Sequence, residues 1–347
     1  MSDLITIAVT GLKYIESPQP GYGLARSLKE AGYRVIGIDD SPLNTAFKSK
    51  DFDKVYVIRE LIKEDKIEFL EKLRLIKEKE NIRVIIPGFD REIFFFNSIR
   101  YEIEELGIKV MIPSSESLVK ASKPHLYELN DKGIAVAETI KIRNFQDVEP
   151  ATQRLGFPVV CKGLLKDAYV AESLTKAKLY FDIVRERWGG GQGSMLFQKY
   201  IAGEPIVLIG IADQENILVR AFVMKKLGTD SKGTTWSGYS LYDEKLISIA
   251  KKFTKETKWV GPFELEFLRT YETQEDFMFE VNPRFPSWVY FATAVGLNLP
   301  DISVRALLGE RVGPDFTYVT GKAFIRCAEE KIVELEELQR LKRDGTI

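Results

Sequence analysis

The chain has 347 residues, which is more than one ordinary hydrophobic core accommodates and therefore predicts two or three lobes. With 45% hydrophobic and 29% charged residues, it has the composition of a soluble globular protein. Its net charge of -1 argues against a general nucleic-acid surface, which would require a basic stripe.

Cysteine usage and the N-terminal segment bear on cellular location. Cys161 and Cys327 are the only cysteines and lack a Cys-x-x-Cys spacing, which favours reduced thiols over a disulfide framework or a zinc site. Residues 1–9 have no basic lead or cleavage site, and no apolar run reaches the roughly 18 residues of a membrane span. We therefore expect a cytoplasmic protein without a membrane partner.

The first 115 residues predict alternating strands and helices. Residues 4–9 form a continuous apolar run suited to a buried parallel strand. The other expected strands are 34–38, 54–58, 83–87 and 109–112, and the expected helices are 21–31, 63–80 and 91–106. This alternation predicts a doubly wound parallel α/β domain.

The first turn of this domain allows a dinucleotide reading. Glycines lie between Gly11 and Gly23, and Asp39 and Asp40 follow the second strand, where acids could hold a ribose. However, no Gly-x-Gly-x-x-Gly joins strand and helix, so the usual tight pyrophosphate turn cannot form. A dinucleotide oxidoreductase is therefore a weaker alternative.

A second turn follows the fourth strand at residues 88–92. It lies at the carboxyl edge of the sheet, where open α/β sheets bind ligands. The alternative is plain helix capping by Asp90, with Arg91 and Glu92 in solvent.

Two lysines in the middle of the chain are candidate anion ligands. Ser122-Lys123-Pro124 is typical of a helix start with Ser122 as cap, and a lysine at that end of the helix dipole favours an anionic partner. Lys162 ends a short apolar strand on the same face as Val160, which points it toward an interior cleft if the strand is covered on both sides. Both lysines could instead be ordinary surface residues.

Further elements are expected between residues 195 and 258. Residues 195–204 predict a strand and turn, and residues 206–212 and 217–227 predict an antiparallel pair. The segment 228–238 is rich in Gly, Ser and Thr, so we expect a mobile loop that could close over a substrate. An amphipathic helix is expected at 243–258.

A late hairpin, residues 263–268 and 277–282, carries the most informative pattern. Side chains alternate between the faces of a strand, so Glu264 and Glu266 share one face of the first strand, and Glu280 and Asn282 share one face of the second. Such acids are costly together unless a cation joins them, and Mg²⁺ prefers oxygen ligands of this kind. The alternative is a solvated acidic face on an edge hairpin.

The run Glu280-Val281-Asn282-Pro283-Arg284, with Glu266 on the preceding strand, resembles the metal-binding signature of the ATP-grasp ligases. The resemblance is closest to the branch of carbamoyl-phosphate synthetase and biotin carboxylase. It implies an α/β and α+β protein with an ATP-grasp fold and an N-terminal doubly wound domain. The implied domains are residues 1–115 before the grasp, a small lobe at 116–200, and a large lobe with the metal hairpin and tail at 201–347.

The resemblance also implies roles for individual residues. Glu266, Glu280 and Asn282 would hold Mg²⁺ or Mn²⁺, and Lys123 and Lys162 would neutralise ATP phosphates. Arg284 would steady the transferred phosphate or the substrate carboxylate. Arg284 and Lys162 are the two expected catalytic residues. The adenine would meet the segment Gln198, Lys199, Tyr200 and Ile201, and Glu204 would hold the ribose.

One departure from the family pattern stands beside these matches. The family has a glycine-rich phosphate loop soon after the second lysine, whereas residues 164–171 contain no glycine. Lys166 could replace the missing backbone donors with a charge. The glycines at 189–193 are expected to form a flexible connection instead.

The implied function is an ADP-forming, Mg²⁺-dependent ligase that joins a small-molecule or peptide carboxylate to an amine through an acyl phosphate. No protein nucleophile is needed, because catalysis rests on placement and charge neutralisation. The alternative is a nucleotide-binding accessory protein with a degenerate site, motivated by the missing loop. A homodimer is expected, and neither a nucleic acid nor a membrane is an expected partner.

Overall fold

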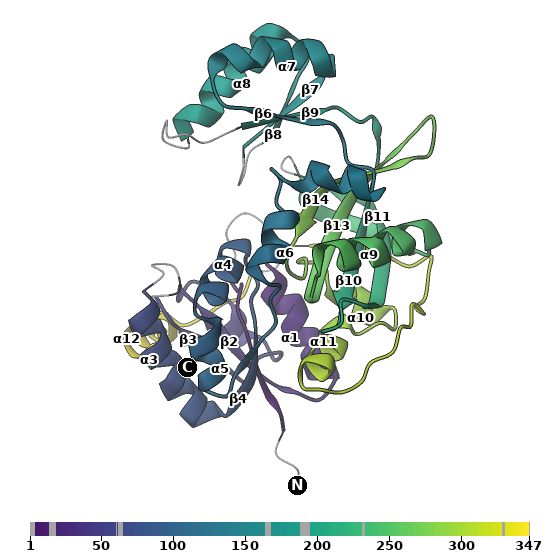
Figure 1. The fold of residues 1–347 in the computed structure, drawn as a ribbon. Helices are drawn as coiled ribbons and strands as arrows, with labels where there is room; N and C mark the ends of the chain where they lie inside the picture. Colours follow the sequence, from purple (N-terminus) through teal and green to yellow (C-terminus); the bar gives the residue numbers. More distant parts are fainter. Residues whose placement is uncertain are drawn as a thin grey trace. The chain divides into compact units, whose positions relative to one another are not determined.

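The computed structural model describes residues 4–13, 19–59, 61, 65–163, 168–187, 195–230, 233–327 and 330–346. The chain forms two compact units (Figure 1). The first unit comprises Met1–Leu118, Val207–Leu265 and Asn282–Ile347, and the second comprises Val119–Ile206 and Glu266–Val281. The expected domain borders near residues 115 and 200 stay a prediction.

A five-stranded parallel sheet lies in the N-terminal part of the first unit, as the sequence predicts. Its strand order is β3-β2-β1-β4-β5, and all neighbouring strands are parallel. Strands β2 and β3 lie on one side of β1, and β4 and β5 lie on the other, so the chain switches sides of the sheet between β3 and β4. Helix α1 (Pro20–Glu30) lies on one face of the sheet, and α3 (Lys66–Glu80) and α4 (Asp90–Ser98) lie on the other (Figure 1). The strands are β1 (Thr6–Val9), β2 (Arg34–Asp39), β3 (Lys54–Val57), β4 (Ile82–Ile86) and β5 (Lys109–Val110).

The helices of this domain differ from expectation by an added 3₁₀ turn, η1, and by the division of one helix into two. They are α1 (Pro20–Glu30), η1 (Ala46–Lys48), α3 (Lys66–Glu80), α4 (Asp90–Ser98) and α5 (Arg100–Glu105). The single helix expected over 91–106 is two helices, because Ile99 leaves the helical region with φ -131° and ψ 21°. Helix α3 begins after Asp65, whose side chain accepts a hydrogen bond from the Glu68 amide.

A six-stranded sheet has the order β14-β13-β10-β11-β12-β15. Its strands are β10 (Gly203–Ala212), β11 (Leu218–Thr229), β12 (Thr235–Leu241), β13 (Gly261–Thr270), β14 (Asp276–Asn282) and β15 (Ala323–Ile325). The expected mobile loop at 228–238 is mostly hairpin, since Gly228 pairs with Ser237 and Thr229 with Thr235. Residues 231 and 232 of that expected loop lie outside the described residues.

A hydrophobic core in the first unit connects its two sheets. It joins Ile7 and Val9 of the parallel sheet to Val207 and Phe222 of the six-stranded sheet, and it includes Trp288. The helices that complete the unit are α9 (Glu244–Thr257), α10 (Tyr290–Ala294) and α11 (Leu299–Leu307). Helix α1 packs against α10 and α11.

The second unit contains a four-stranded antiparallel sheet and its own core. The sheet order is β6-β9-β7-β8, from β6 (Thr139–Ile142), β7 (Val159–Lys162), β8 (Ala168–Ala171) and β9 (Met195–Lys199). Helices α7 (Val148–Leu155) and α8 (Leu174–Arg187) cover it, and Cys161, Phe181 and Phe197 lie in the core. Residues 266–281 contact the rest of this unit through Met278, whose backbone amide donates a hydrogen bond to the Ala135 carbonyl at 2.8 Å.

The segment around Lys123 differs from the expected α-helix. Helix α6 (Ser115–Lys120) ends before it, and a 3₁₀ helix, η2 (Leu126–Lys132), follows His125. The Ser122 hydroxyl donates backward to the Val119 carbonyl instead of capping a new helix. Another 3₁₀ turn, η3 (Phe145–Asp147), precedes α7.

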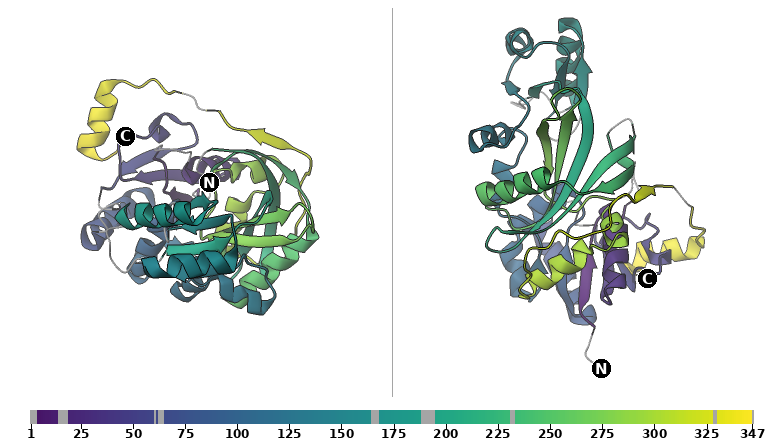
Figure 2. Two further views of the ribbon diagram at one scale, coloured as in Figure 1. Left: turned by 90° about the horizontal axis from the view of Figure 1, so that it is seen from above. Right: turned by 90° about the vertical axis from the view of Figure 1, so that its right-hand side faces the viewer.

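The C-terminal tail returns to the parallel sheet. Helix α12 (Leu335–Asp344) lies beside the N-terminal part of the first unit (Figure 2). The Val57 amide of edge strand β3 donates to the Gly345 carbonyl at 2.8 Å. Among the helices that the structure describes, none has the length and apolar character needed to cross a membrane.

Candidate functional site

Four predicted site residues come together within the second unit, although they lie far apart in the sequence. Lys162 ends β7, Lys123 lies in the turn before η2, and Glu266 and Glu280 lie on β13 and β14. The Lys123 Nζ atom is 3.0 Å from Glu280 Oε1. Burial lowers the pKa of Lys162 to about 8. The carboxylates of Glu280 and Glu266 act to raise this pKa, and the ammonium group of Lys123 acts to lower it further.

This arrangement suits a ligand that is both anionic and metal-bound. Two ammonium groups near each other repel, so a polyphosphate between them would stabilise both charges. Among the described residues, no group of three or more acidic, histidine or cysteine side chains could hold a metal ion by itself. A pair of carboxylates fits Mg²⁺, which takes one or two carboxylates and completes its shell with phosphate oxygens and water.

Asn282 and Arg284 belong to the first unit. Asn282 donates from Nδ2 to Oε2 of the buried Glu264 at 2.8 Å, so its carboxamide oxygen is the atom suited to a metal. Arg284 Nε is 2.9 Å from Asp90 Oδ1, and its Nη2 donates to Asp90 Oδ2 at 3.3 Å. Sequence reasoning missed this pair because nothing local connects residues 90 and 284.

The turn at 88–92 corrects the expectation for Glu92. This side chain is buried instead of solvated, and it accepts hydrogen bonds from Thr10 Oγ1 and from the Gly88 and Phe89 amides. Burial raises the pKa of Glu92 to about 7. The acid that caps the start of α4 is therefore Glu92, while Asp90 pairs with Arg284.

The two acids after β2 hold the first turn in place. Asp39 is buried and accepts hydrogen bonds from the Leu12 and Ser41 amides. Burial, with the neighbouring Asp40 as a further cause, raises the pKa of Asp39 to about 8. Asp40 forms ion pairs with Lys13 and Arg91, both at 3.3 Å. The acids considered as ribose ligands thus have structural partners within the domain.

The predicted adenine segment begins on an internal strand. Strand β9 pairs with β6 on one side and β7 on the other, so Gln198 and Lys199 do not lie at a sheet edge, where backbone groups would be free to pair with an adenine. The Gln198 side chain donates to Thr139 Oγ1 at 2.9 Å. Tyr200, which is 41% exposed, and Ile201 follow the strand, and Glu204 lies on β10. Their roles toward ATP stay predictions.

A large cavity lies within the first unit beside the segment that follows Arg284. It has a volume of about 890 Å³, and its walls include Trp288 and Tyr290. Among the described residues of its wall, four are cationic, Arg26, Lys322, Arg326 and Lys331, and one is acidic, Asp51. Arg26 stacks over the Tyr290 ring at 3.8 Å, and Arg326 donates to the Ser287 hydroxyl at 3.2 Å.

Two expectations on phosphate coverage fall outside the described residues. They are the suggested role of Lys166 and the flexible connection at residues 189–193.

The chain is similar to known proteins in both sequence and structure, although no family model matches it. It is 22% identical over 300 residues to the carbamoyl phosphate synthase large chain of Clostridium acetobutylicum, covering 82% of this chain but only 27% of that protein. The chain therefore spans about a quarter of that relative's length.

Two solved structures extend the similarity to the fold. N5-carboxyaminoimidazole synthetase from Staphylococcus aureus matches with a TM-score of 0.71 and 15% identity, over 98% of this chain and 85% of that one. The biotin carboxylase domain of Hydrogenobacter thermophilus 2-oxoglutarate carboxylase, in complex with Mg-ADP and bicarbonate, matches with a TM-score of 0.68 and 17% identity, over 89% and 71%. The chain thus has the ATP-grasp fold, and its resemblance to the branch of carbamoyl-phosphate synthetase and biotin carboxylase is confirmed.

Proposed function

We propose that the chain is an ATP- and Mg²⁺-dependent ligase that joins a carboxylate to an amine through an acyl phosphate. The observation that carries this proposal is the cluster of Lys123, Lys162, Glu266 and Glu280 in the second unit. The relatives support it, since one solved structure holds Mg-ADP with bicarbonate. The comparisons give no support to the alternative of a degenerate accessory protein.

In this proposal the chain's residues place and neutralise charge. Lys123 and Lys162 bind phosphate oxygens of ATP, and Glu266, Glu280 and Asn282 hold the metal, which supplies charge neutralisation at the phosphates. Arg284, aligned by Asp90, orients an anionic group of the substrate. A substrate carboxylate oxygen attacks the γ-phosphorus with loss of ADP; the amine then attacks the acyl carbon, releasing phosphate and a proton.

The carboxylate substrate is proposed to be an organic acid of amino-acid or peptide size. The cavity beside Trp288, at about 890 Å³, falls in the range of about 300–1,000 Å³ typical of small-molecule sites. Among the described residues of its wall, cationic side chains outnumber acidic ones, which favours an anion, and the aromatic side chains favour an apolar body. We also propose a cytoplasmic homodimer, which light scattering would test.

The decisive experiment measures ADP release from Mg-ATP, with hydroxylamine as a general amine and a panel of amino acids, short peptides and bicarbonate. A hydroxamate that depends on one acid would establish the acyl phosphate and identify the acid. If bicarbonate alone stimulated ADP release, the proposed size of the substrate would be wrong. Absence of ATP binding by calorimetry with Mg²⁺ present would overturn the ligase proposal.

A further inference from the structure

The first turn of α4 connects three other segments of the first unit through consecutive residues. Asp90 reaches the segment after β14, where Arg284 Nε lies 2.9 Å from Asp90 Oδ1. Arg91 reaches the end of β2, where its Nη2 lies 3.3 Å from Oδ2 of Asp40. Glu92 reaches the residue that follows β1.

Glu92 is the buried member of this turn. It is 2% exposed, whereas the side chains of the two residues before it are 51% and 45% exposed. Its Oε2 atom accepts three hydrogen bonds, from Thr10 Oγ1, from the Gly88 amide at 3.1 Å and from the Phe89 amide at 3.0 Å. The Gly88 amide also donates to Thr10 Oγ1 at 2.9 Å. One buried carboxyl oxygen therefore ties the start of α4 to the end of β1.

The ion pair between Asp90 and Arg284 needs such support. The Asp90 side chain is half in solvent, and an exposed ion pair contributes little by itself, because water screens it and both side chains lose conformational freedom. The orientation of the Arg284 guanidinium thus depends on how firmly the backbone holds Asp90. That backbone is the turn to which Glu92 is hydrogen-bonded.

We propose that Glu92 is a positioning residue for Arg284. It fixes the first turn of α4 against β1, Asp90 is thereby presented in one place, and the guanidinium is aligned before a substrate binds. The part of this inference that concerns substrate binding rests on the proposed function, in which Arg284 contacts the substrate. Glu92 itself acts only through Asp90.

The test measures how fast solvent exchanges the Nε hydrogen of Arg284 in the full chain, by NMR, with Arg284→Lys to assign the signal. Glu92→Ala removes all three hydrogen bonds, so exchange should become about tenfold faster than in the parent. Glu92→Gln keeps an oxygen that can accept the same bonds, so exchange should stay close to that of the parent. Unchanged exchange in Glu92→Ala would overturn the proposal.

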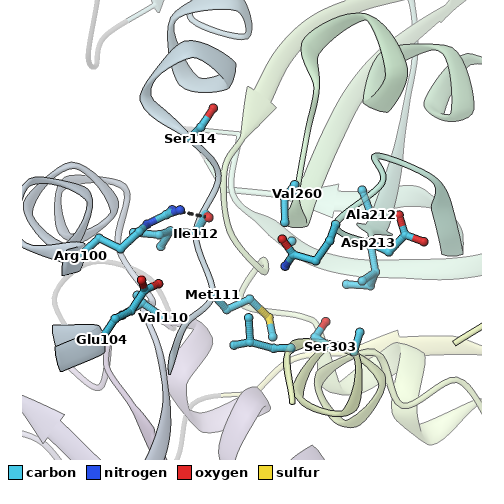
Figure 3. Close-up of a pocket in the computed structure, with 15 residues that line it drawn as sticks. Arg100, Glu104, Val110, Met111, Ile112, Ser114, Ala212, Asp213, Val260 and Ser303 are labelled. Atoms are coloured by element: carbon cyan, nitrogen blue, oxygen red, sulfur yellow. Dashed lines mark hydrogen bonds between the residues drawn. The ribbon is translucent and has the colours of Figure 1, made fainter. Parts of the chain in front are cut away.

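Two further variants keep this test sharp. Thr10→Val removes one donor to Glu92 with little change in shape, so it should accelerate exchange in the same direction even if Glu92→Ala does not fold. Glu104→Ala is the matched control, because it removes a carboxylate from the neighbouring helix α5. Glu104 lines a separate cavity of about 160 Å³, and neither Asp90 nor Arg284 is among the residues described there (Figure 3). Equal acceleration in this control would also overturn the proposal.

Steady-state kinetics tests the link to the substrate. With the acid that supports ADP release, Glu92→Ala should raise KM for the acid about tenfold and leave KM for Mg-ATP unchanged. An equal rise in both constants would contradict an action through Arg284. If the parent releases no ADP with any acid, the ligase proposal fails, while the exchange rates of Arg284 still decide whether Glu92 positions it.

Discussion

At the scale of single residues, the protonation of Lys162 is the feature most open to test. Burial lowers its pKa from the ordinary 10.5 to about 8, so the side chain is charged below that pH and neutral above it. We expect the affinity for Mg-ATP to fall as pH rises through about 8, because a neutral amine no longer attracts phosphate. Calorimetric titration across this range measures the effect.

The arginine variant provides the control for this pH dependence. Arginine remains protonated in proteins, so Lys162→Arg should remove the fall in ATP affinity near pH 8, which we call the break, even if it weakens binding overall. An unchanged break in this variant would assign the titration to another group. The free energy of unfolding depends on pH in the opposite direction to ATP affinity. Between about pH 8 and pH 10.5 the folded state binds fewer protons at Lys162 than the unfolded state, so the contribution of this lysine to stability rises as pH rises through that range.

Glu280 is the residue whose charge matters to both the proposed metal and the lysines. Glu280→Gln should lower Mg²⁺-dependent ADP release by about two orders of magnitude, since a carboxylate facing the proposed metal is lost. Because Glu280 opposes the lowering of the Lys162 pKa, the break in ATP affinity should also move to lower pH. Mg²⁺ titration of turnover measures the first effect, and unchanged turnover would contradict the metal assignment.

Sequence reasoning reached some of these residues and missed others for a physical reason. Lys123 and Glu280 were expected in one site through the family resemblance, and they are 3.0 Å apart. The pairing of Arg284 with Asp90, and the burial of Glu92, depend on chain segments that meet only in the folded state. Alternation along one strand predicts a face but not which residue lies opposite.

At the scale of elements, the β13–β14 hairpin contains a buried ion pair near its turn. Asp276, at the start of β14, accepts hydrogen bonds from Arg269 Nε at 2.7 Å and from Arg269 Nη2 at 3.0 Å. Asp276→Asn should destabilise the second unit by about 2 kcal/mol, less than the ~3–5 kcal/mol of a fully buried pair because the Arg269 side chain is 19% exposed. Hydrogen exchange of β14 amides would measure the loss.

An exposed pair in the same unit supplies the comparison. Glu172 and Lys176 form an (i, i+4) ion pair at 2.6 Å with both side chains largely in solvent. Glu172→Gln should therefore leave exchange in β14 unchanged. Equal behaviour of the two variants would mean that the Asp276 pair does not hold the hairpin.

The adjoining ends of β1 and β4 require a glycine at residue 88. A Cβ atom there would lie 2.6 Å from the Thr10 carbonyl oxygen and 2.9 Å from Gly11 Cα, and backbone atoms cannot move aside as a flexible side chain can. Gly88→Ala should cost about 1–3 kcal/mol in the free energy of unfolding. Gly313→Ala is the control, because a Cβ there would meet nothing within 4 Å, and denaturant titration of the two variants should separate them.

The element predictions succeeded where the pattern is local and failed where neighbours decide. The apolar run at residues 4–9 predicted a buried parallel strand, and β1 is buried along its whole length. The helix break at Ile99 was missed because no proline or glycine marks it in the sequence. The internal position of β9 was missed because the local sequence does not indicate which strands pair with it.

At the scale of the whole molecule, the chain crosses between its two compact units more than once. Residues 119–206 and 266–281 form one unit, and the segments before, between and after them form the other. Sequence reasoning proposed consecutive lobes, because composition and periodicity indicate elements in chain order. A hairpin shared by two units is a long-range feature, which only the contacts of its two halves reveal.

The tail completes the first unit by covering an open sheet edge. Leu341 of α12 is fully buried, Lys48 Nζ lies 2.7 Å from Glu337 Oε1, and Thr346 pairs with Tyr56 of edge strand β3. A chain shortened to end at Ile332 should expose this strand and self-associate, because free edge strands pair with other chains. Light scattering over a concentration series would show association above that of the full chain. Glu336→Gln, exposed on the same helix, should match the full chain. If the shortened chain matched it too, edge protection by the tail would be refuted.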